Sequence, residues 1–109
     1  MKMRPPKHLG LATRRWFAHV AENFELEQHH FRLLQLAGEA WDRAEMARQA
    51  IAEHGLTYID RFGSPRARPE VAVARDATIA FARLLRELDL DIEPPTSPRR
   101  PTALLSNRR

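Results

Sequence analysis

The stretch ELEQHHFRLLQLAGEAWDRAEMARQAIAEH, residues 25–54, decides the fold because it is the longest uninterrupted helical pattern in the 109-residue chain. Its polar residues recur at steps of three and four, which places them in one narrow solvated stripe along a helix. The stripe consists of Gln28, Arg32, Gln35, Glu39, Asp42, Glu45, Gln49 and Glu53. The remaining positions are apolar or small, so the apolar arc is wider than in a typical surface helix. We therefore expect neighbouring elements on two sides of this helix.

Two shorter helices flank the central one. Thr13 is a suitable N-cap for a helix that ends near Asn23 and has Trp16 and Val20 on its apolar side. Pro69 suits the first position of a last helix, which has an apolar face and should pack on the central helix. The predicted core consists of Trp16, Phe31, Leu34, Trp41, Phe81 and Leu85.

The segment LTYIDRFGSPRAR, residues 56–68, changes to a period of two and contains the turn-forming sequence Phe62-Gly63-Ser64-Pro65. This pattern predicts a short β-hairpin or turn, with Pro65 allowed only at an edge. Gly55 is suited to a left-handed conformation that ends the central helix, with Leu56 folding back on its last turn. Because a lone hairpin is marginally stable in water, we expect it to lie on the helices or on another subunit.

The expected fold class is all-α, with a helical oligomerisation domain at residues 12–91 between a basic flexible arm at 1–11 and a disordered, Pro/Arg-rich tail at 92–109. Its helices span about 13–23, 25–54 and 69–89, and the hairpin spans about 56–68. A core of this size supplies only about 3–5 kcal/mol. The central helix also has more apolar surface than its neighbours can cover, so we expect a homo-oligomer. The candidate interface residues are Leu33, Leu36, Gly38, Ala40 and Phe62.

The net charge of +4 is unevenly distributed: residues 1–15 carry +5, 16–54 carry −4, 55–91 are neutral and 92–109 carry +3. Basic ends fit nucleic-acid contacts made by arms, and they also occur on proteins that bind no nucleic acid. Arginines beside the hairpin turn suit phosphates or the acids of an adjacent subunit, and Phe62 at the tip slightly favours the subunit contact. The candidate DNA-facing residues are Lys2, Arg4, Lys7, Arg14 and Arg15, with Arg61, Arg66 and Arg68 as a second set.

Catalytic chemistry finds little support in the sequence. The chain has no cysteine, and its four glycines stand apart, so it has no Gly-rich phosphate loop. Glu27 and His30 share a helix face as in di-metal bundles, but the second Glu-x-x-His is missing, and we interpret His29 and His30 as polar positions at a helix start. Gly38 costs about 1 kcal/mol relative to alanine, which indicates either a tolerated defect or the close approach of another helix. We expect no enzyme activity, no cofactor and no metal.

The motifs Thr13-Arg14-Arg15-Trp16, Leu26-Glu27-Gln28-His29-His30 and Gly55-Leu56-Thr57 through Asp60-Arg61-Phe62-Gly63 occur in this order, followed by Pro69, Arg75-Asp76 and the segment 81–91. In this order and spacing the chain resembles the small terminase subunits of tailed bacteriophages over about residues 7–93. The resemblance implies a helical, non-catalytic protein that assembles into a homo-oligomeric ring and binds viral double-stranded DNA during genome packaging. It also implies a second partner, the large terminase subunit, which carries the ATPase and nuclease and is regulated by the small one.

The chain departs from this family at Arg68-Pro69, where relatives often have His-Pro. Only about twelve residues precede the first predicted helix, too few for an N-terminal helix-turn-helix, so DNA contacts should run through basic arms and turns. In the tail, Leu104 and Leu105 are candidates for docking the large subunit, although plain disorder explains them nearly as well.

Because no 18-residue apolar run or signal peptide is visible, we expect a soluble, cytosolic protein without membrane contact. The resemblance implies that this is the cytoplasm of a bacterial host and that the protein has no small-molecule substrate. Two alternatives to the packaging role stay open. One is a phage head-completion or assembly adaptor, which is also small and ring-forming but binds protein and not DNA. The other is a small dimeric helical DNA-binding regulator. A steep salt dependence of DNA binding would separate both DNA-binding hypotheses from the adaptor.

Overall fold

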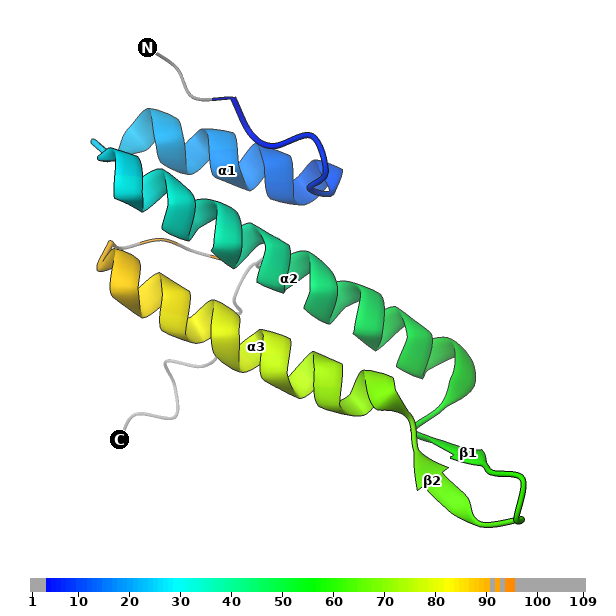
Figure 1. Ribbon diagram of the computed structural model, residues 1–109. Helices are drawn as coiled ribbons and strands as arrows, with labels where there is room; N and C mark the ends of the chain where they lie inside the picture. The colour runs from blue at the N-terminus through cyan, green and yellow to red at the C-terminus, as the bar shows by residue number, and fades with distance from the viewer. Residues whose placement is uncertain (1–3, 91, 93, 96–109) are drawn as a thin grey trace, which may run out of the picture.

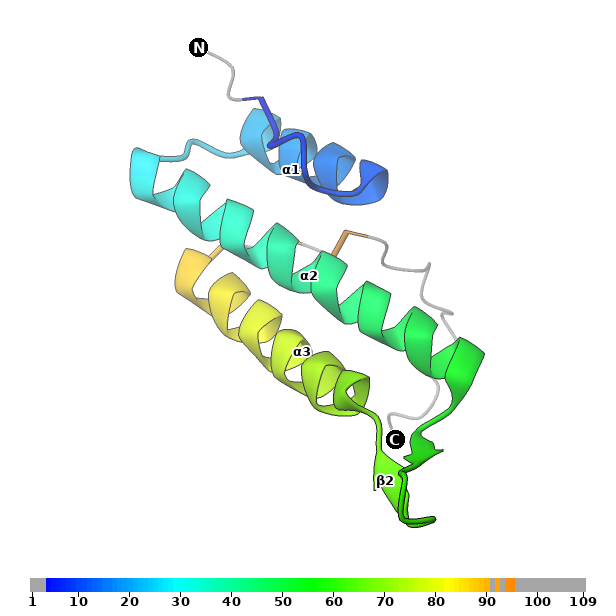
Figure 2. The same ribbon diagram turned by 45° about the vertical axis from the view of Figure 1, so that its right-hand side comes forward.

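A computed structural model of the chain describes residues 4–90, 92, 94 and 95. Its elements follow the chain as α1 (Leu11–Asn23), α2 (Gln28–His54), β1 (Thr57–Ile59), β2 (Pro65–Ala67) and α3 (Pro69–Leu88). The helices lie side by side with α2 in the middle, and the hairpin projects beyond the end of α2 and α3 (Figures 1 and 2). The helical fold class with one short antiparallel hairpin is thus confirmed, as are the two neighbours of the central helix.

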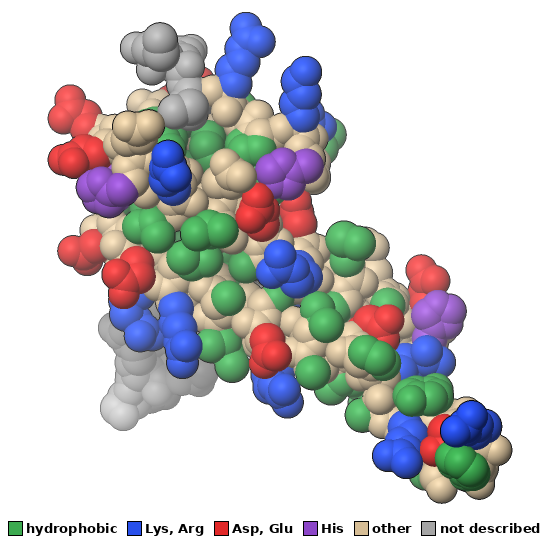
Figure 3. Space-filling model, viewed as in Figure 1, with side chains coloured by type: hydrophobic (Ala, Val, Ile, Leu, Met, Phe, Trp, Pro, Cys, Tyr) green, Lys and Arg blue, Asp and Glu red, His purple; other side chains and the backbone are tan. Residues whose placement is uncertain are grey.

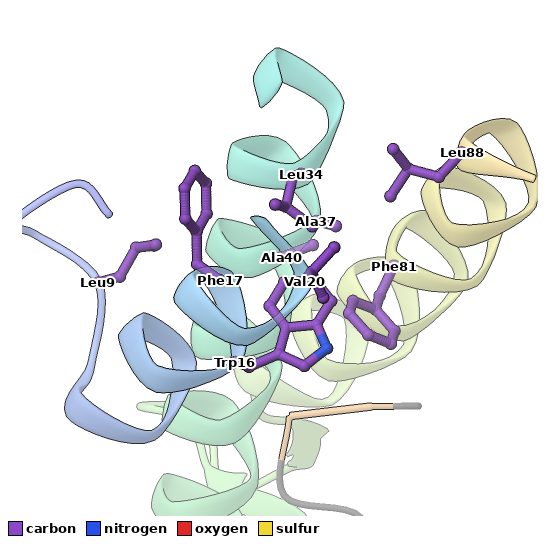
Figure 4. Packing of buried hydrophobic residues seen from close by; sticks show 9 residues of the cluster. All are labelled: Leu9, Trp16, Phe17, Val20, Leu34, Ala37, Ala40, Phe81 and Leu88. Carbon is purple, nitrogen blue, oxygen red and sulfur yellow. The ribbon is translucent and has the colours of Figure 1, made fainter. Parts of the chain in front are cut away.

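The core lies where all three helices meet. Trp16 of α1 and Trp41 of α2 both approach Phe81 of α3, with ring centroids 6.0 and 5.0 Å apart, respectively. Figure 4 shows Trp16 and Phe81 converging from opposite sides of α2. Three of the six predicted core residues, Trp16, Leu34 and Phe81, are buried, while Phe31, Trp41 and Leu85 are partly buried and pack against them.

The α2 helix has a line of small residues on its buried side. Ala37, Ala40, Ala44 and Ala47 follow each other at steps of three and four, which defines one helix face, and all four are buried. Among the helices and strands of the described residues, only α3 runs beside the second half of α2 (Figure 1). Since alanine has no side chain beyond Cβ, the two helices can approach closely over this length.

The first helix begins at Leu11, with Gly10 as its N-cap residue, and not at Thr13. Thr13 lies inside α1, is buried, and donates its hydroxyl to Asp42 Oδ1 of α2 at 2.5 Å. The Gly10 amide donates to the other oxygen of the same carboxylate at 2.7 Å. The prediction that Thr13 is the N-cap of α1 is therefore wrong. The carboxylate of Asp42, on the neighbouring helix α2, accepts the hydrogen bonds at the start of α1.

Part of the predicted flexible arm packs on α2. Leu9 is buried, and His8 contacts Glu39 at 2.7 Å through Nε2 and Oε2. Gln35 donates to the same Glu39 oxygen at 3.0 Å, and these two contacts lower the pKa of Glu39, the Gln35 hydrogen bond most. Glu39 and Asp42 belong to the stripe that we expected to be solvated. At these two positions the side chains instead form hydrogen bonds to the segment before α1 and to its first turn.

Gly38 lies under the same segment. A Cβ atom at this position would lie 3.0 Å from Thr13 Cγ2 and 3.3 Å from Leu9 Cδ1. The close approach of another helix is therefore real, and it comes from α1 of the same chain. Gly38 and Ala40 are both buried within the chain, so their assignment to a subunit interface stays a prediction that the single chain does not support with an exposed surface.

The ends of α2 also differ from expectation. The helix begins at Gln28, after a capping box in which the Glu27 side chain accepts the His30 amide and the Glu27 amide donates to His30 Nδ1 at 3.0 Å. His30 is thus a polar residue of the helix start, as interpreted from the sequence. Gly55 has the positive φ of 86° that favours glycine, but its ψ of −178° is not that of the left-handed helical conformation predicted to end α2. Leu56 consequently does not fold back on the last turn and is 60% exposed.

The last helix starts at Pro69, as predicted, and ends at Leu88, where Asp89 adopts a left-handed conformation with a φ of 54°. Beyond it, Ile92 packs against the core, so the chain is still part of the folded body at the start of the predicted tail. Leu104 and Leu105 lie outside the described residues.

Candidate DNA and subunit interface

The hairpin turn is organised by one carboxylate. Asp60 Oδ1 accepts the amides of Phe62 and Ser64, each at 2.9 Å, and Asp60 Oδ2 accepts Arg66 Nε at 2.9 Å. The amide of Ser64, followed by Arg66 and the amide of Phe62, lowers the pKa of Asp60. Gly63 supplies the positive φ of 80° that the turn requires. The turn is therefore ordered by hydrogen bonds among its own residues. Asp60, the only acidic residue of the hairpin, is engaged in these hydrogen bonds.

The tip of this ordered turn is exposed. Phe62 is 76% exposed, and the Arg61 guanidinium lies over its ring, 5.0 Å from the centroid. Such a cation–π contact is worth about 0.5–1 kcal/mol at an exposed site. It pairs a positive charge with a flat apolar surface at the end of the molecule that is farthest from α1 (Figures 1 and 3).

The base of the hairpin is tied to α2. The Arg68 amide donates to the Leu56 carbonyl at 2.9 Å, and Arg68 Nε donates to the His54 carbonyl at 3.2 Å. A cation that caps the last carbonyls of a helix is also favoured by the helix dipole. Of the three hairpin arginines, Arg66 and Arg68 thus have hydrogen-bond partners within the fold, while Arg61 lies over the Phe62 ring at the exposed tip.

The basic residues expected to face DNA fall into two separate groups. Arg4, Lys7 and Arg15 are exposed around α1, and Arg14 is partly buried there. Lys2 lies outside the described residues. The hairpin arginines lie at the opposite end of the long axis (Figure 1), so one chain does not gather the two sets into a single surface.

Several large apolar side chains remain open to solvent. Leu36 on α2 is 50% exposed, and Leu33 is partly buried against the core. Sequence reasoning missed Ile59, which is 66% exposed, and Met46. The alternation of the hairpin strands could have identified Ile59, because neighbouring strand residues point to opposite faces. Figure 3 shows apolar side chains spread over α2 and α3 among charged ones.

Within the described part of the chain, no group of three or more His, Cys, Asp or Glu side chains could hold a metal ion. In the same residues, no helix combines the length and the apolar character that crossing a membrane requires.

Comparison with known proteins connects this geometry to a family. A family model described as "Phage terminase, small subunit" matches residues 14–100, which include nearly all of α1, the whole of α2 and α3, and the hairpin. The match confirms the resemblance found in the sequence motifs. No curated protein and no solved structure matches the chain.

Proposed function

The chain belongs to the small subunits of phage terminase, and from this premise we propose that it is a ring-forming, non-catalytic regulator of viral DNA packaging. Its proposed partners are viral double-stranded DNA and the large terminase subunit, whose ATPase and nuclease it modulates in the cytoplasm of the bacterial host. The family match over residues 14–100 carries this proposal. The exposed hairpin supports the assembly into a ring, and the two basic groups support the binding of DNA.

The hairpin, whose strands do not pack on the helices of their own chain, favours assembly into a ring. All six strand residues of β1 and β2 are exposed, although an isolated two-stranded hairpin is marginally stable in water. Contact with another subunit would bury part of this surface. We assign Phe62 and Leu36 to the subunit interface because both are at least half exposed, together with Leu33, which lies one turn from Leu36 on α2.

DNA binding is assigned to the two basic groups, Lys2, Arg4, Lys7, Arg14 and Arg15 at one end and Arg61, Arg66 and Arg68 at the other. A ring repeats each group once per subunit and so arranges each group in a circle of positive charge. Each phosphate contact contributes about −0.9 to the slope of log K against log salt for B-DNA. Because contacts of this kind carry little sequence information, we expect the basic groups to position DNA and not to read bases.

The mass of the protein in solution and its DNA affinity test the proposal together. Light scattering at moderate salt is expected to give a multiple of 12.6 kDa that corresponds to a closed ring. Titration with double-stranded DNA at several salt concentrations is expected to give a steep slope. Arg61→Ala should reduce that slope, whereas Arg75→Ala, in which an exposed arginine beside Asp76 on α3 is removed, is the matched control.

Other outcomes would redirect the assignment. A ring without DNA affinity would favour the assembly adaptor, and a dimer that binds DNA would favour the small regulator. Stimulation of large-subunit ATPase activity separates the packaging role from both. We further propose that Leu104 and Leu105 dock the large subunit; a truncation after residue 95 that leaves the stimulation intact would overturn this assignment.

A further inference from the structure

The helices α2 and α3 are joined by contacts in which α1 takes no part. Trp41 of α2 meets Phe81 of α3 with ring centroids 5.0 Å apart, and the two helices lie side by side along the line of alanines of α2 (Figures 1 and 2). By contrast, α1 has only 13 residues. Isolated helices shorter than about 12–15 residues are marginally stable in water. We therefore expect α1 to stay helical mainly because it is docked on the rest of the chain.

The buried side chains of α1 are held from more than one direction. The Thr13 hydroxyl donates to a carboxylate of α2, and the rings of Phe17 and Phe31 of α2 are 6.3 Å apart. Trp16 instead meets Phe81 of α3 at 6.0 Å and is only 6% exposed. The chain that follows α3 completes the surroundings of this tryptophan.

After α3 the chain turns back towards α1. The Ile92 amide donates to the Leu90 carbonyl at 2.9 Å, which closes a three-residue turn. Both residues are partly buried and pack against the core cluster that contains Trp16. In Figure 4 this part of the chain, in pale orange, crosses below Trp16. We call the four described residues that follow Asp89 the strap; they are Leu90, Ile92, Pro94 and Pro95.

The strap and α1 form the two walls of a hollow of about 730 Å³. Its α1 wall consists of Ala12, Arg15, Trp16 and His19, whose spacing places them on one face of the helix. Its other wall consists of Ile92, Pro94 and Pro95. The helix α1 is therefore bordered by α2 on one side and by the strap on another.

The same hollow includes a cation that we assigned to DNA. Arg15 is exposed and lines the hollow opposite the prolines of the strap. A cation on a helix that has left its docked position must be fixed again when a phosphate binds, and this ordering costs conformational entropy. The position of α1 therefore bears on how well Arg15 holds a phosphate.

From this arrangement we propose that the strap is a conformational device that keeps α1 docked, the state in which Arg15 contacts phosphates. The helix α1 is then a two-state element, docked while the strap lies on it and open when the strap is displaced. That the strap holds α1 follows from the fold alone, whereas the link to phosphates rests on the proposed DNA binding. The two parts are tested separately.

Hydrogen exchange of the full-length chain without DNA tests the hold on α1. Ile92→Ala removes most of a partly buried side chain of the strap and changes no charge. Its α1 amides are expected to exchange about three- to tenfold faster than in the wild type, because less apolar surface holds the docked state. The amides of α2 and α3 are expected to keep their wild-type rates. Ile79→Ala removes the same atoms from an isoleucine of α3 that is 44% exposed, and should leave all three helices unchanged.

A second variant loosens the strap without removing Ile92. Replacing Pro94 and Pro95 together by glycine gives the strap more conformational freedom, so α1 exchange should again rise, by a smaller factor. Wild-type α1 rates in both variants would overturn the inference. An equal acceleration of all three helices would overturn it too, because α1 would then open only together with the whole domain.

Exchange in the presence of double-stranded DNA tests the link to phosphates. If DNA binds only the docked state, free DNA at ten times its dissociation constant should slow α1 exchange about tenfold. The same factor is expected in Ile92→Ala, so that DNA compensates for the weakened strap. Arg15→Ala at the same DNA concentration should show less slowing, because one phosphate contact is lost.

The outcomes with DNA separate this inference from the proposed function. DNA that binds in a titration but leaves α1 exchange unchanged would overturn the link between the strap and Arg15. A wild-type chain that binds no DNA would overturn the proposed DNA binding and this link together. In that case the exchange rates without DNA still decide whether the strap holds α1.

Discussion

Replacing Asp42 by alanine should release the start of α1 from α2. The carboxylate accepts the Thr13 hydroxyl at 2.5 Å and the Gly10 amide at 2.7 Å, and alanine accepts neither. Thr13 is only 2% exposed, so water cannot readily replace its lost partner, whereas Gly10 is exposed and can bond to water. The two groups therefore lose different amounts of free energy.

A buried hydroxyl left without a partner costs about 1–3 kcal/mol, and an exposed amide loses about 0.5–1.5 kcal/mol. Together, Asp42→Ala should lower the free energy of unfolding by about 1.5–4.5 kcal/mol, a large part of the total for a small domain. Glu45→Ala, one turn farther along α2, removes an exposed pair with Arg48 and should cost less than about 1 kcal/mol.

Urea unfolding followed by circular dichroism measures both changes, at one fixed protein concentration because assembly shifts apparent stability. Thr13→Val removes the hydroxyl, so Asp42→Ala in that background should cost at least about 1 kcal/mol less than in the wild type. Equal costs in the two backgrounds would refute the hydrogen bond as the source of the stability. A loss no larger than that of Glu45→Ala would refute the role of Asp42 as a whole.

Three further changes test other contacts. Gly38→Ala should lower the free energy of unfolding, measured with urea, by up to about 2 kcal/mol. Crowding of the new methyl group against the Thr13 methyl costs about 1–3 kcal/mol, which exceeds the gain in helix propensity of about 1 kcal/mol. A variant that is more stable than the wild type would contradict this prediction. Glu27→Ala removes the capping box and should cost about 0.5–2 kcal/mol in the same assay, against little change for the exposed Glu25→Ala. The lowered pKa of Asp60 means that the hairpin turn is fully stabilised above the usual aspartate pKa of about 3.9 and loosens only as the pH falls through the lower value. NMR titration of the Phe62 and Ser64 amides should show this midpoint, and a midpoint at or above about 3.9 would contradict it.

Local signals in the sequence were sufficient for the helices and the hairpin. Periodicity identified α2 and α3, Pro69 set the start of α3, and the residues from Phe62 to Pro65 indicated the turn. The role of Asp42 could not be predicted, because a polar residue at that step of a helix has the same pattern whether it faces water or a neighbouring chain segment. Its partner Thr13 lies 29 residues away, and only the packing of α1 brings the two together.

For the candidate site, the position of two residues in an exposed turn was predictable from the sequence, whereas the arrangement of the site was not. Arg61 and Phe62 were found from the turn sequence, and both lie at the exposed tip. The distance between the hairpin and the basic group around α1 depends on the length and direction of α2, which composition does not give. Gly38 was interpreted as a close approach, but whether the approaching helix belonged to the same chain or to another was decided by where α1 docks.

The contact of Trp16 with Phe81 has a consequence for how the chain is made. The two rings are 65 positions apart, so the ribosome must add that many residues before the tryptophan can meet its partner. At about 5–20 residues per second, this takes about 3–13 s. During synthesis Phe17 of α1 can already pack on Phe31 of α2, whereas the side of α1 that carries Trp16 stays uncovered by α3 for this time and is open to chaperones and to other nascent chains. The helices α2 and α3, joined by a short hairpin, can pair as soon as both have emerged.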